Sequence, residues 1–358
     1  MDRIMNKSIR HFFKPLLGVL LAGLLGSAQA SDEGLTIRIG SPDQGAGSQP
    51  FVQGVVGLAH IQQQLEQEFA ASGVKVQWHF FKGAGPAVNE ALANQQLDFA
   101  WLGDLAAIIG RSSGLQTRLL LGARGANMYL AVTPQSGIKQ LADLKGKRVA
   151  VYRGTADQLS FARALESQGL KERDLQIISL DWAAARAALV SGQIDATWSG
   201  MGVLGLESKG ILFPLSTKQL SRQSTTQAGL IGTQAFIDQH PELTQRLLKV
   251  LVKNAFWLSD PGSLAEYSKL MGDRSSTPAA LFVRELKDDD LKFRNSPRID
   301  PFLKSALQDS VEQARKLGLI RRTFSVDEWV EPRFVEEAVQ ERKLTGFWPE
   351  YDAAGNAL

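Results

Sequence analysis

The sequence of 358 residues contains no cysteine. Disulfide frameworks, thiolate metal sites and cysteine nucleophiles are therefore excluded. Methionine is also scarce, because only Met128, Met201 and Met271 lie beyond the first thirty residues. Chance or avoidance of oxidation outside the cytoplasm explains this scarcity as well as economy of sulfur does, and the composition leaves both explanations open.

Histidine is equally sparse, and its spacing gives no sign of a zinc site. His60, His79 and His240 stand far apart, without the H-x-x-x-H or H-E-x-x-H pattern that places two ligands on one helix face. The chain also lacks a Walker-type phosphate loop. We therefore predict no metal, no cofactor and no catalytic residue.

The N-terminus carries an apolar run that is too short to span a membrane, and no later apolar run is long enough to do so. A basic start is followed by the apolar segment 16–25 and by Ala28-Gln29-Ala30, a small-residue cleavage site. These features predict a secretory signal peptide over residues 1–30, cleaved after Ala30. We therefore expect a periplasmic protein.

Neither sign of charge dominates the remaining chain. Removal of residues 1–30 takes away four basic residues and one acidic residue, which leaves 36 of each sign. No basic stripe points to nucleic acid. The hydrophobic content of 44% and charged content of 22% are typical of a soluble globular protein, and the length suffices for two lobes.

The segment 80–105 carries the most informative pattern. An apolar run ends at Phe81, a Gly-rich loop follows, and Pro86 stands where we expect the first position of a helix. A buried strand over 97–102 then ends at Gly103. A Gly-rich loop that opens a helix suits an anion, because it presents free N–H groups and the positive end of the helix dipole. The alternative is an ordinary strand-to-helix connection.

This segment resembles periplasmic substrate-binding proteins of ABC importers, in the branch that captures aliphatic sulfonates, taurine and sulfate esters. The resemblance rests on Gly85-Pro86, Glu90-Ala91-Leu92, Gln96-Leu97-Asp98 and Gly103-Asp104, which agree with that branch in type and spacing. It extends over nearly the whole chain beyond residue 30. It implies an α/β fold of the type 2 periplasmic binding proteins, with two lobes, two hinge crossings and a ligand in the cleft between the lobes.

The second lobe is expected to repeat the pattern of the first. Residues 187–198 share with residues 90–101 an Ala-rich helix, a polar turn, an LD or ID pair and a buried strand with tryptophan. Asp98 and Asp195 are then equivalent turn residues, although a carboxylate pair for acid–base work is the alternative. Other predicted elements include a helix over 54–71 and helices that begin at Pro241 and Pro301.

Domain boundaries follow from the resemblance. Lobe one is expected to combine residues 31–121 with residues 226–358, and lobe two to cover residues 122–225. The loop around Gly154 opens a helix whose predicted N-cap is Thr155, and the Thr155 hydroxyl either caps that helix or faces a ligand.

The predicted ligand site draws on both lobes. The Gly-rich helix starts are expected to supply N–H donors. Arg124 and Arg153 are expected to add positive charge, with the alternative that each is an ordinary surface residue. Trp198 is expected to contact the organic tail of the ligand, with the alternative that it lies in the core. Asp104 is expected to orient backbone donors. The predicted ligand-binding residues are Asp43, Gly85, Gly103, Asp104, Arg124, Arg153, Thr155, Ala156 and Trp198.

One departure from the family bears on the ligand. Relatives often carry a W-D-P motif after the second ID strand, where this chain has Trp198 followed by Ser-Gly-Met-Gly. Smaller residues there predict a roomier pocket, which favours a bulkier sulfonate or an aryl or alkyl sulfate ester over a small alkanesulfonate.

These features predict a monomeric binding protein that delivers an organosulfur anion to an ABC permease at the inner membrane. The alternative is the same fold with another small ligand, such as nitrate, bicarbonate or a pyrimidine precursor. A periplasmic enzyme on this fold is the third hypothesis.

Overall fold

The computed structural model describes residues 34–45, 47, 49–275 and 277–358. The predicted signal peptide and its cleavage site after Ala30 lie outside the described residues. Across the described part of the chain, no helix combines the length and the apolar character needed to cross a membrane.

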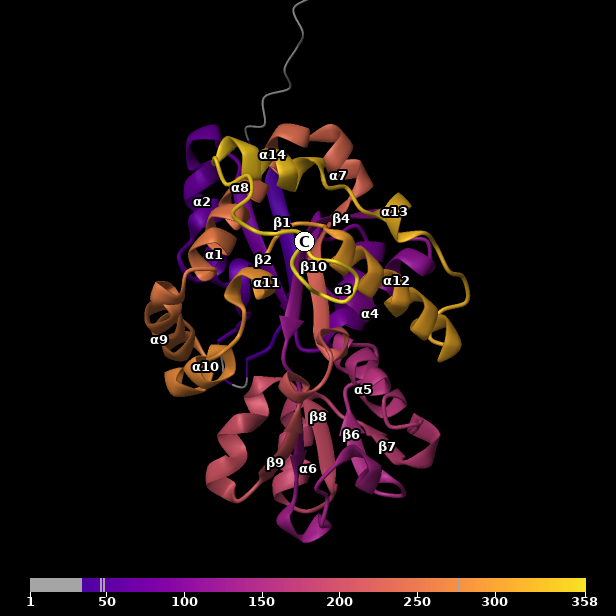
Figure 1. Ribbon diagram of the computed structural model, residues 1–358. Helices are drawn as coiled ribbons and strands as arrows, with labels where there is room; N and C mark the ends of the chain where they lie inside the picture. The colour runs from indigo at the N-terminus through magenta and orange to yellow at the C-terminus, as the bar shows by residue number, and fades with distance from the viewer. Residues whose placement is uncertain (1–33, 46, 48, 276) are drawn as a thin grey trace, which may run out of the picture. The chain divides into compact units, whose positions relative to one another are not determined.

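The first sheet has five strands in the order β2-β1-β3-β10-β4 (Figure 1). β1 pairs in parallel with β2 and β3, whereas β10 runs antiparallel to both β3 and β4. The strand bounds are β1 (Thr36–Pro42), β2 (Lys75–Phe81), β3 (Phe99–Gly103), β4 (Thr117–Ala126) and β10 (Thr226–Thr233).

The second sheet repeats this arrangement, with the strand order β7-β6-β8-β5-β9. Its first three strands are parallel, and β5 is antiparallel to its two neighbours. The strand bounds are β5 (Tyr129–Val132), β6 (Arg148–Val151), β7 (Gln176–Ser179), β8 (Ala196–Ser199) and β9 (Leu212–Ser216). Two α/β sheets of matching topology confirm the predicted fold class.

The α-helices follow the strands and then dominate the last third of the chain (Figure 1). α8 and α12 begin at the predicted prolines, whose missing N–H groups are not needed in a first turn. The bounds are α1 (Gly54–Ile61), α2 (Gln64–Phe69), α3 (Ala84–Ala93), α4 (Asp104–Ser112), α5 (Ala156–Glu166), α6 (Trp182–Val190), α7 (Gln234–Gln239), α8 (Pro241–Leu258), α9 (Leu264–Arg274), α10 (Ala279–Leu286), α11 (Leu291–Arg294), α12 (Pro301–Lys316), α13 (Val326–Trp329) and α14 (Arg333–Glu341).

Two predicted helix boundaries are wrong. The helix expected over 54–71 is divided into α1 and α2, because Gln63 adopts a left-handed φ of 52° that ends the α-helical path. Pro86 is the third residue of α3 and not the first, because the helix already begins at Ala84.

Helices cover both faces of the first sheet, as strand β3 shows. Phe99 and Trp101 belong to the apolar cluster that includes α1, α8 and α14. Ala100 and Leu102, which point to the opposite face, belong to the cluster that includes α3, α4 and α12. Burial on both faces explains why this strand is a continuous apolar run and does not alternate with polar residues.

Each sheet is fastened by one guanidinium–carboxylate clamp. In the first sheet, Asp98 accepts hydrogen bonds from the Arg38 backbone N–H at 2.8 Å and from its guanidinium at 2.6 Å. In the second sheet, Asp195 accepts from the Arg148 backbone N–H at 2.9 Å and from its guanidinium at 2.7 Å. Both aspartates are thus equivalent turn residues, as predicted, and each side chain is engaged within its own sheet.

The chain passes between the sheets twice. It leaves the first sheet after β4, reaches β5 through Asn127 and Met128, and returns between β9 and β10. The two crossings agree with the predicted architecture. The lobe boundaries at residues 121 and 226 stay a prediction, and β4 itself continues in the first sheet as far as Ala126.

Candidate functional site

A cavity of about 270 Å³ is lined by residues of both sheets and of both crossings. Gly103 at the carboxyl end of β3 and Ser199 at the carboxyl end of β8 contribute to it, together with Asn127 at the first crossing and Thr226 at the second. Carboxyl ends of strands are where open α/β sheets place their ligands.

Two helix starts contribute to the cavity wall. Gly85 in the first turn of α3 and Ala156 in the first turn of α5 both line it. First-turn N–H groups lack partners within their own helix, and the helix dipole adds partial positive charge there.

Close contacts hold these two helix starts together. A Cβ added to Gly103 would lie 2.8 Å from the Ala156 Cβ, and one added to Gly154 would lie 3.1 Å from the Pro86 ring. Gly154 has a φ of 77°, which a residue with a side chain adopts only with strain. The glycines therefore allow an approach between the two loops that larger residues would prevent.

Arg186 brings a full positive charge to the cavity. It lies in α6, lines the cavity, and its guanidinium reaches within 3.2 Å of the position that a Cβ on Gly202 would occupy. Burial lowers the pKa of Arg186, an effect that Asp181 partly offsets. Among the described residues, Arg186 forms no ion pair with a carboxylate, so its charge is available to a ligand.

Asp157 places a buried carboxylate at the same wall. It is the second residue of α5, and it accepts a hydrogen bond from the Trp182 indole N–H at 2.8 Å. Burial raises the pKa of Asp157 to about 6, and the nearby Asp104 carboxylate adds to the rise. The carboxyl group is therefore mostly ionised at neutral pH, and its repulsion of an anion weakens as the pH falls through about 6.

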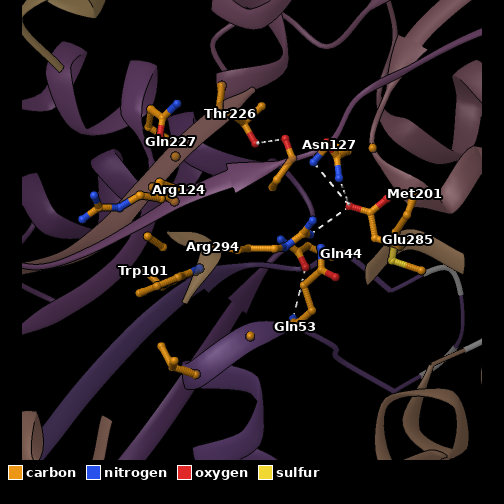
Figure 2. A pocket seen from close by; sticks show the side chains of 18 of the residues that line it. Gln44, Gln53, Trp101, Arg124, Asn127, Met201, Thr226, Gln227, Glu285 and Arg294 are labelled. Carbon is orange, nitrogen blue, oxygen red and sulfur yellow. Dashed lines mark hydrogen bonds and ion pairs between the residues drawn. The ribbon is translucent and has the colours of Figure 1, made fainter. Parts of the chain in front are cut away.

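A compact ionic cluster closes another side of the cavity (Figure 2). The Glu285 carboxylate pairs with Arg294 at 2.8 Å and accepts hydrogen bonds from Asn127 and from the Tyr129 hydroxyl. Asp289 pairs with Arg294 at 2.5 Å and with Lys218 at 3.0 Å. Two carboxylates thus face two cations, and the cluster has no net charge.

Five of the predicted ligand-binding residues line the cavity: Gly85, Gly103, Arg124, Thr155 and Ala156. Thr155 occupies the N-cap position of α5, but its hydroxyl donates to the Tyr152 carbonyl at 2.7 Å and makes no capping hydrogen bond. The predicted capping role is therefore wrong, whereas contact between the Thr155 hydroxyl oxygen and a ligand stays a prediction.

Arg124 lines the cavity, but its guanidinium is paired with Asp300 and its charge is not available to a ligand. Its side chain has no exposed surface, and its guanidinium bonds to both carboxylate oxygens of Asp300 at 2.6 Å. In Figure 2 this side chain extends away from the cluster of Asn127, Glu285 and Arg294. The prediction that Arg124 lends charge to the ligand site is not supported, because Asp300 already neutralises it.

Four predicted residues do not line the cavity. Trp198 is buried in the core of the second sheet, where its ring packs at a tilt against Phe161, 5.7 Å between centroids, and its indole N–H donates to the Ser160 hydroxyl. The alternation of β8 directs Trp198 to the α5 side, while its neighbour Ser199 lines the cavity.

The other three of these residues have structural partners. Asp43 accepts from the backbone N–H groups of Gly45 and Phe51 and pairs with Lys82 at 2.9 Å, so it orders its own loop. Asp104 is buried and accepts from the Leu105 backbone N–H and the Ser310 hydroxyl. Arg153 is half exposed, with its guanidinium 3.7 Å from Glu172.

Sequence reasoning missed several lining residues. Trp182 and Arg186 stand four residues apart on α6, so they share one face of that helix. The rest of this segment is rich in alanine, so a tryptophan and an arginine on one helix face are a sequence signal that could have indicated ligand contact. Further missed lining residues are Phe51, Gln53, Trp101, Asp157, Tyr267, Phe282, Glu285 and Arg294.

The family described as NMT1/THI5 like matches residues 69–261, more than half of the chain. The chain belongs to this family. The match includes α3, α5 and α6, which carry the helix starts and Arg186, and it ends before α9 and α10. The matched segment contains lining residues of both sheets and of both crossings.

Named relatives of this NMT1/THI5-like chain are binding proteins. A Bacillus subtilis (strain 168) protein, provisionally named aliphatic sulfonates-binding protein, is 28% identical over 79% of this chain and 84% of its own length. A solved structure from Methylobacillus flagellatus KT, described as a periplasmic sulfonate-binding protein SsuA, is 29% identical with a TM-score of 0.78. The alignment covers 89% of this chain and 98% of that one.

The same fold also occurs in an enzyme. A solved structure of the desulfurization enzyme DSZB has a TM-score of 0.65 at 16% identity, and the alignment covers 86% of this chain and 99% of that one. At this identity the similarity concerns the fold alone.

Proposed function

We propose that this protein is the periplasmic solute-binding component of an ABC importer and that it captures an organosulfur anion, a sulfonate or a sulfate ester. In this proposal the chain is secreted through its signal peptide, acts as a monomer, and delivers its ligand to a membrane permease. The observation that carries the proposal is the convergence of two helix starts and the unpaired Arg186 on one cavity.

The chemistry of this wall suits a sulfonate head. Three oxygens share one negative charge, so they need several N–H donors and a nearby cation more than they need acceptors. The first turns of α3 and α5 supply backbone donors, and Arg186 supplies up to two parallel N–H groups. The relatives named for sulfonates support the same head group.

The remainder of the cavity argues against a ligand without a tail. Phe51, Trp101, Tyr267 and Phe282 line it together with aliphatic side chains. Nitrate and bicarbonate would leave this apolar surface uncovered, whereas an organic tail removes it from water. We therefore favour an organosulfur anion over the small inorganic anions.

We propose that binding of the ligand changes how the two sheets are arranged relative to each other. A ligand that contacts residues of both sheets stabilises the arrangement in which both sets of contacts are made. The permease would then recognise that arrangement. We assign no reaction to the protein, because the named relatives in its family are binding proteins and the 358 residues contain no cysteine nucleophile.

A thermal-shift panel on the chain from residue 31 onward tests the proposal. Alkanesulfonates, taurine, aryl sulfate esters, nitrate, sulfate and a pyrimidine are each added in excess. A ligand at about 100 times its Kd stabilises the native state by about 2.7 kcal/mol, which raises the melting temperature measurably. A rise with nitrate or the pyrimidine alone would contradict the proposal.

The variant Arg186→Gln tests the proposed head-group contact in the same assay. Loss of a charge-assisted hydrogen bond costs about 1.5–3 kcal/mol, so calorimetry should show roughly 10- to 100-fold weaker binding. Arg173→Gln, at an exposed position outside the cavity, removes the same charge and should leave the affinity within about twofold. Equal losses in both variants would mean that Arg186 acts only through the net charge.

A further inference from the structure

The cavity contains an aromatic chamber, which we define as Phe51, Trp101, Tyr267 and Phe282. Its four side chains come from the loop after β1, from β3, from α9 and from α10. Phe282 makes edge contacts with Phe51 at 6.2 Å and with Tyr267 at 6.4 Å between ring centroids. Phe51, Phe282 and Tyr267 therefore form a packed aromatic surface, and Trp101 lines the same cavity.

The chamber is well fixed. The backbone N–H of Gly54 donates to the Tyr267 hydroxyl at 2.9 Å, and burial raises the pKa of that hydroxyl to about 12. Tyr267 is therefore neutral at physiological pH and anchored through its polar end. Phe51, Trp101 and Phe282 are each at least nine-tenths buried. Rings that are already ordered lose little freedom when they receive a ligand.

No net charge opposes an apolar tail in this part of the cavity. Glu285, the charged residue of α10 that lines the cavity, is neutralised within the cluster that it forms with Arg294, Asp289 and Lys218. An ammonium group, such as the one in taurine, would find no free carboxylate in that cluster. The uncompensated cation, Arg186, belongs to the wall that also holds the α5 start.

The size of the cavity also favours a ring. An apolar cavity of about 150 Å³ accommodates benzene. The volume of about 270 Å³ found here leaves room for a ring together with a sulfonate head. The segment 199–202, predicted to be small and to widen the pocket, does line the cavity, and a Cβ on Gly200 would meet no atom within 4 Å.

We infer that the organosulfur ligand carries an aromatic ring, which the aromatic chamber takes up while the –SO₃⁻ group lies at the helix starts and Arg186. This inference rests on the proposed function and specifies its ligand class. Aryl sulfonates and aryl sulfate esters share this chemistry, since both join an apolar ring to an –SO₃⁻ group. α9 and α10, which supply Tyr267 and Phe282, lie beyond the segment that the family match covers.

Calorimetry with matched ligands tests the inference on the chain from residue 31 onward. Benzenesulfonate, phenyl sulfate and ethanesulfonate share the head-group charge, and benzyl alcohol carries the ring without that charge. Benzenesulfonate or phenyl sulfate should bind roughly 10- to 100-fold more tightly than ethanesulfonate, because the ring buries more apolar surface. The ratio between the two aryl ligands identifies which linkage the site prefers.

The variant Phe282→Leu locates the ring in the chamber. Benzenesulfonate should bind roughly 5- to 30-fold less tightly to it, while ethanesulfonate should change less than about twofold. Phe256→Leu is the matched control, because Phe256 is exposed on α8 and does not line the cavity. If Phe282→Leu fails to fold, Phe51→Leu replaces it as the chamber variant, with the same expected results.

Two outcomes would overturn the inference, and they differ from failure of the proposed function. If ethanesulfonate or taurine binds as tightly as benzenesulfonate, the protein captures organosulfur anions without selecting a ring. If Phe282→Leu and Phe51→Leu weaken both ligands equally, the chamber does not hold the tail. If no sulfonate or sulfate ester binds at all, the proposed function fails and this inference with it.

Discussion

The buried carboxyl group of Asp157 predicts an unusual dependence of stability on pH. Burial raises its pKa from the ordinary 3.8 to about 6 in the folded protein. The folded state therefore binds a proton more tightly than the unfolded state does. The resulting stabilisation is fully present below about pH 3.8, falls as the pH rises, and is lost above about pH 6.

The variant Asp157→Asn removes this dependence while keeping an oxygen acceptor for the Trp182 indole. A shift of about two pKa units corresponds to about 3 kcal/mol, because each unit is worth about 1.4 kcal/mol. We therefore expect the variant to be more stable than the wild type by up to about 3 kcal/mol at pH 8. The gain should shrink below about 1 kcal/mol at pH 4, where the wild-type group is protonated in the folded protein.

Urea denaturation of both proteins at pH 4, 6 and 8 measures the difference. Asp143→Asn is a control of opposite sign, because backbone hydrogen bonds from residues 139 and 140 lower the pKa of Asp143. That variant should lose stability at pH 8. The reasoning is refuted if Asp157→Asn is no more stable than the wild type at pH 8, or if its gain is the same at pH 4.

The same group should make ligand binding depend on pH. A bound anion close to the α5 start raises the pKa of Asp157 further, since a second negative charge disfavours ionisation. Binding then takes up a proton, and the affinity of the wild type falls as the pH rises through about 6. Asp157→Asn should bind the same anion with an affinity that changes little between pH 6 and pH 8.

Two further variants test other contacts. Asp300→Asn leaves the buried Arg124 guanidinium without a counter-charge and should cost about 3–5 kcal/mol in urea denaturation; a loss below about 1 kcal/mol, as expected for an exposed pair, would contradict this. Gly103→Ala brings a Cβ within 2.8 Å of the Ala156 Cβ and should weaken ligand binding roughly 5- to 100-fold in calorimetry. Gly205→Ala is its control, because Gly205 does not line the cavity and a Cβ there would meet Leu281 only at an ordinary 3.7 Å; equal losses in both variants would refute the steric argument.

The parts of the site that sequence could predict are those with local signals. Gly85 and Ala156 were found because a Gly-rich loop before a helix indicates free N–H groups, whatever the rest of the chain does. The fold class was predictable from the resemblance, whose motifs over residues 85–104 are also local. The two clamped turns at Asp98 and Asp195 follow from the same kind of pattern.

Other parts depend on contacts between distant segments. Arg124 and its partner Asp300 are 176 residues apart, so no local pattern distinguishes a neutralised arginine from an available one. Trp198 lies in a strand whose residues are all buried, and such a strand does not reveal which face meets the cavity. Arg186 was missed because an arginine in a helix is usually a solvated surface residue, and only the tertiary structure brings it to the cavity.

The duplicated clamps have a consequence for how the protein can change under mutation. Arg38 in β1 bonds to Asp98, directly before β3, and Arg148 in β6 bonds to Asp195, directly before β8. Each sheet therefore keeps its register through bonds of its own. A substitution that weakens one clamp therefore acts on the strand pairing of one sheet. Ligand-facing residues of one sheet can therefore change by mutation while the other sheet retains its strand pairing. The two sheets can thus evolve separately within one chain.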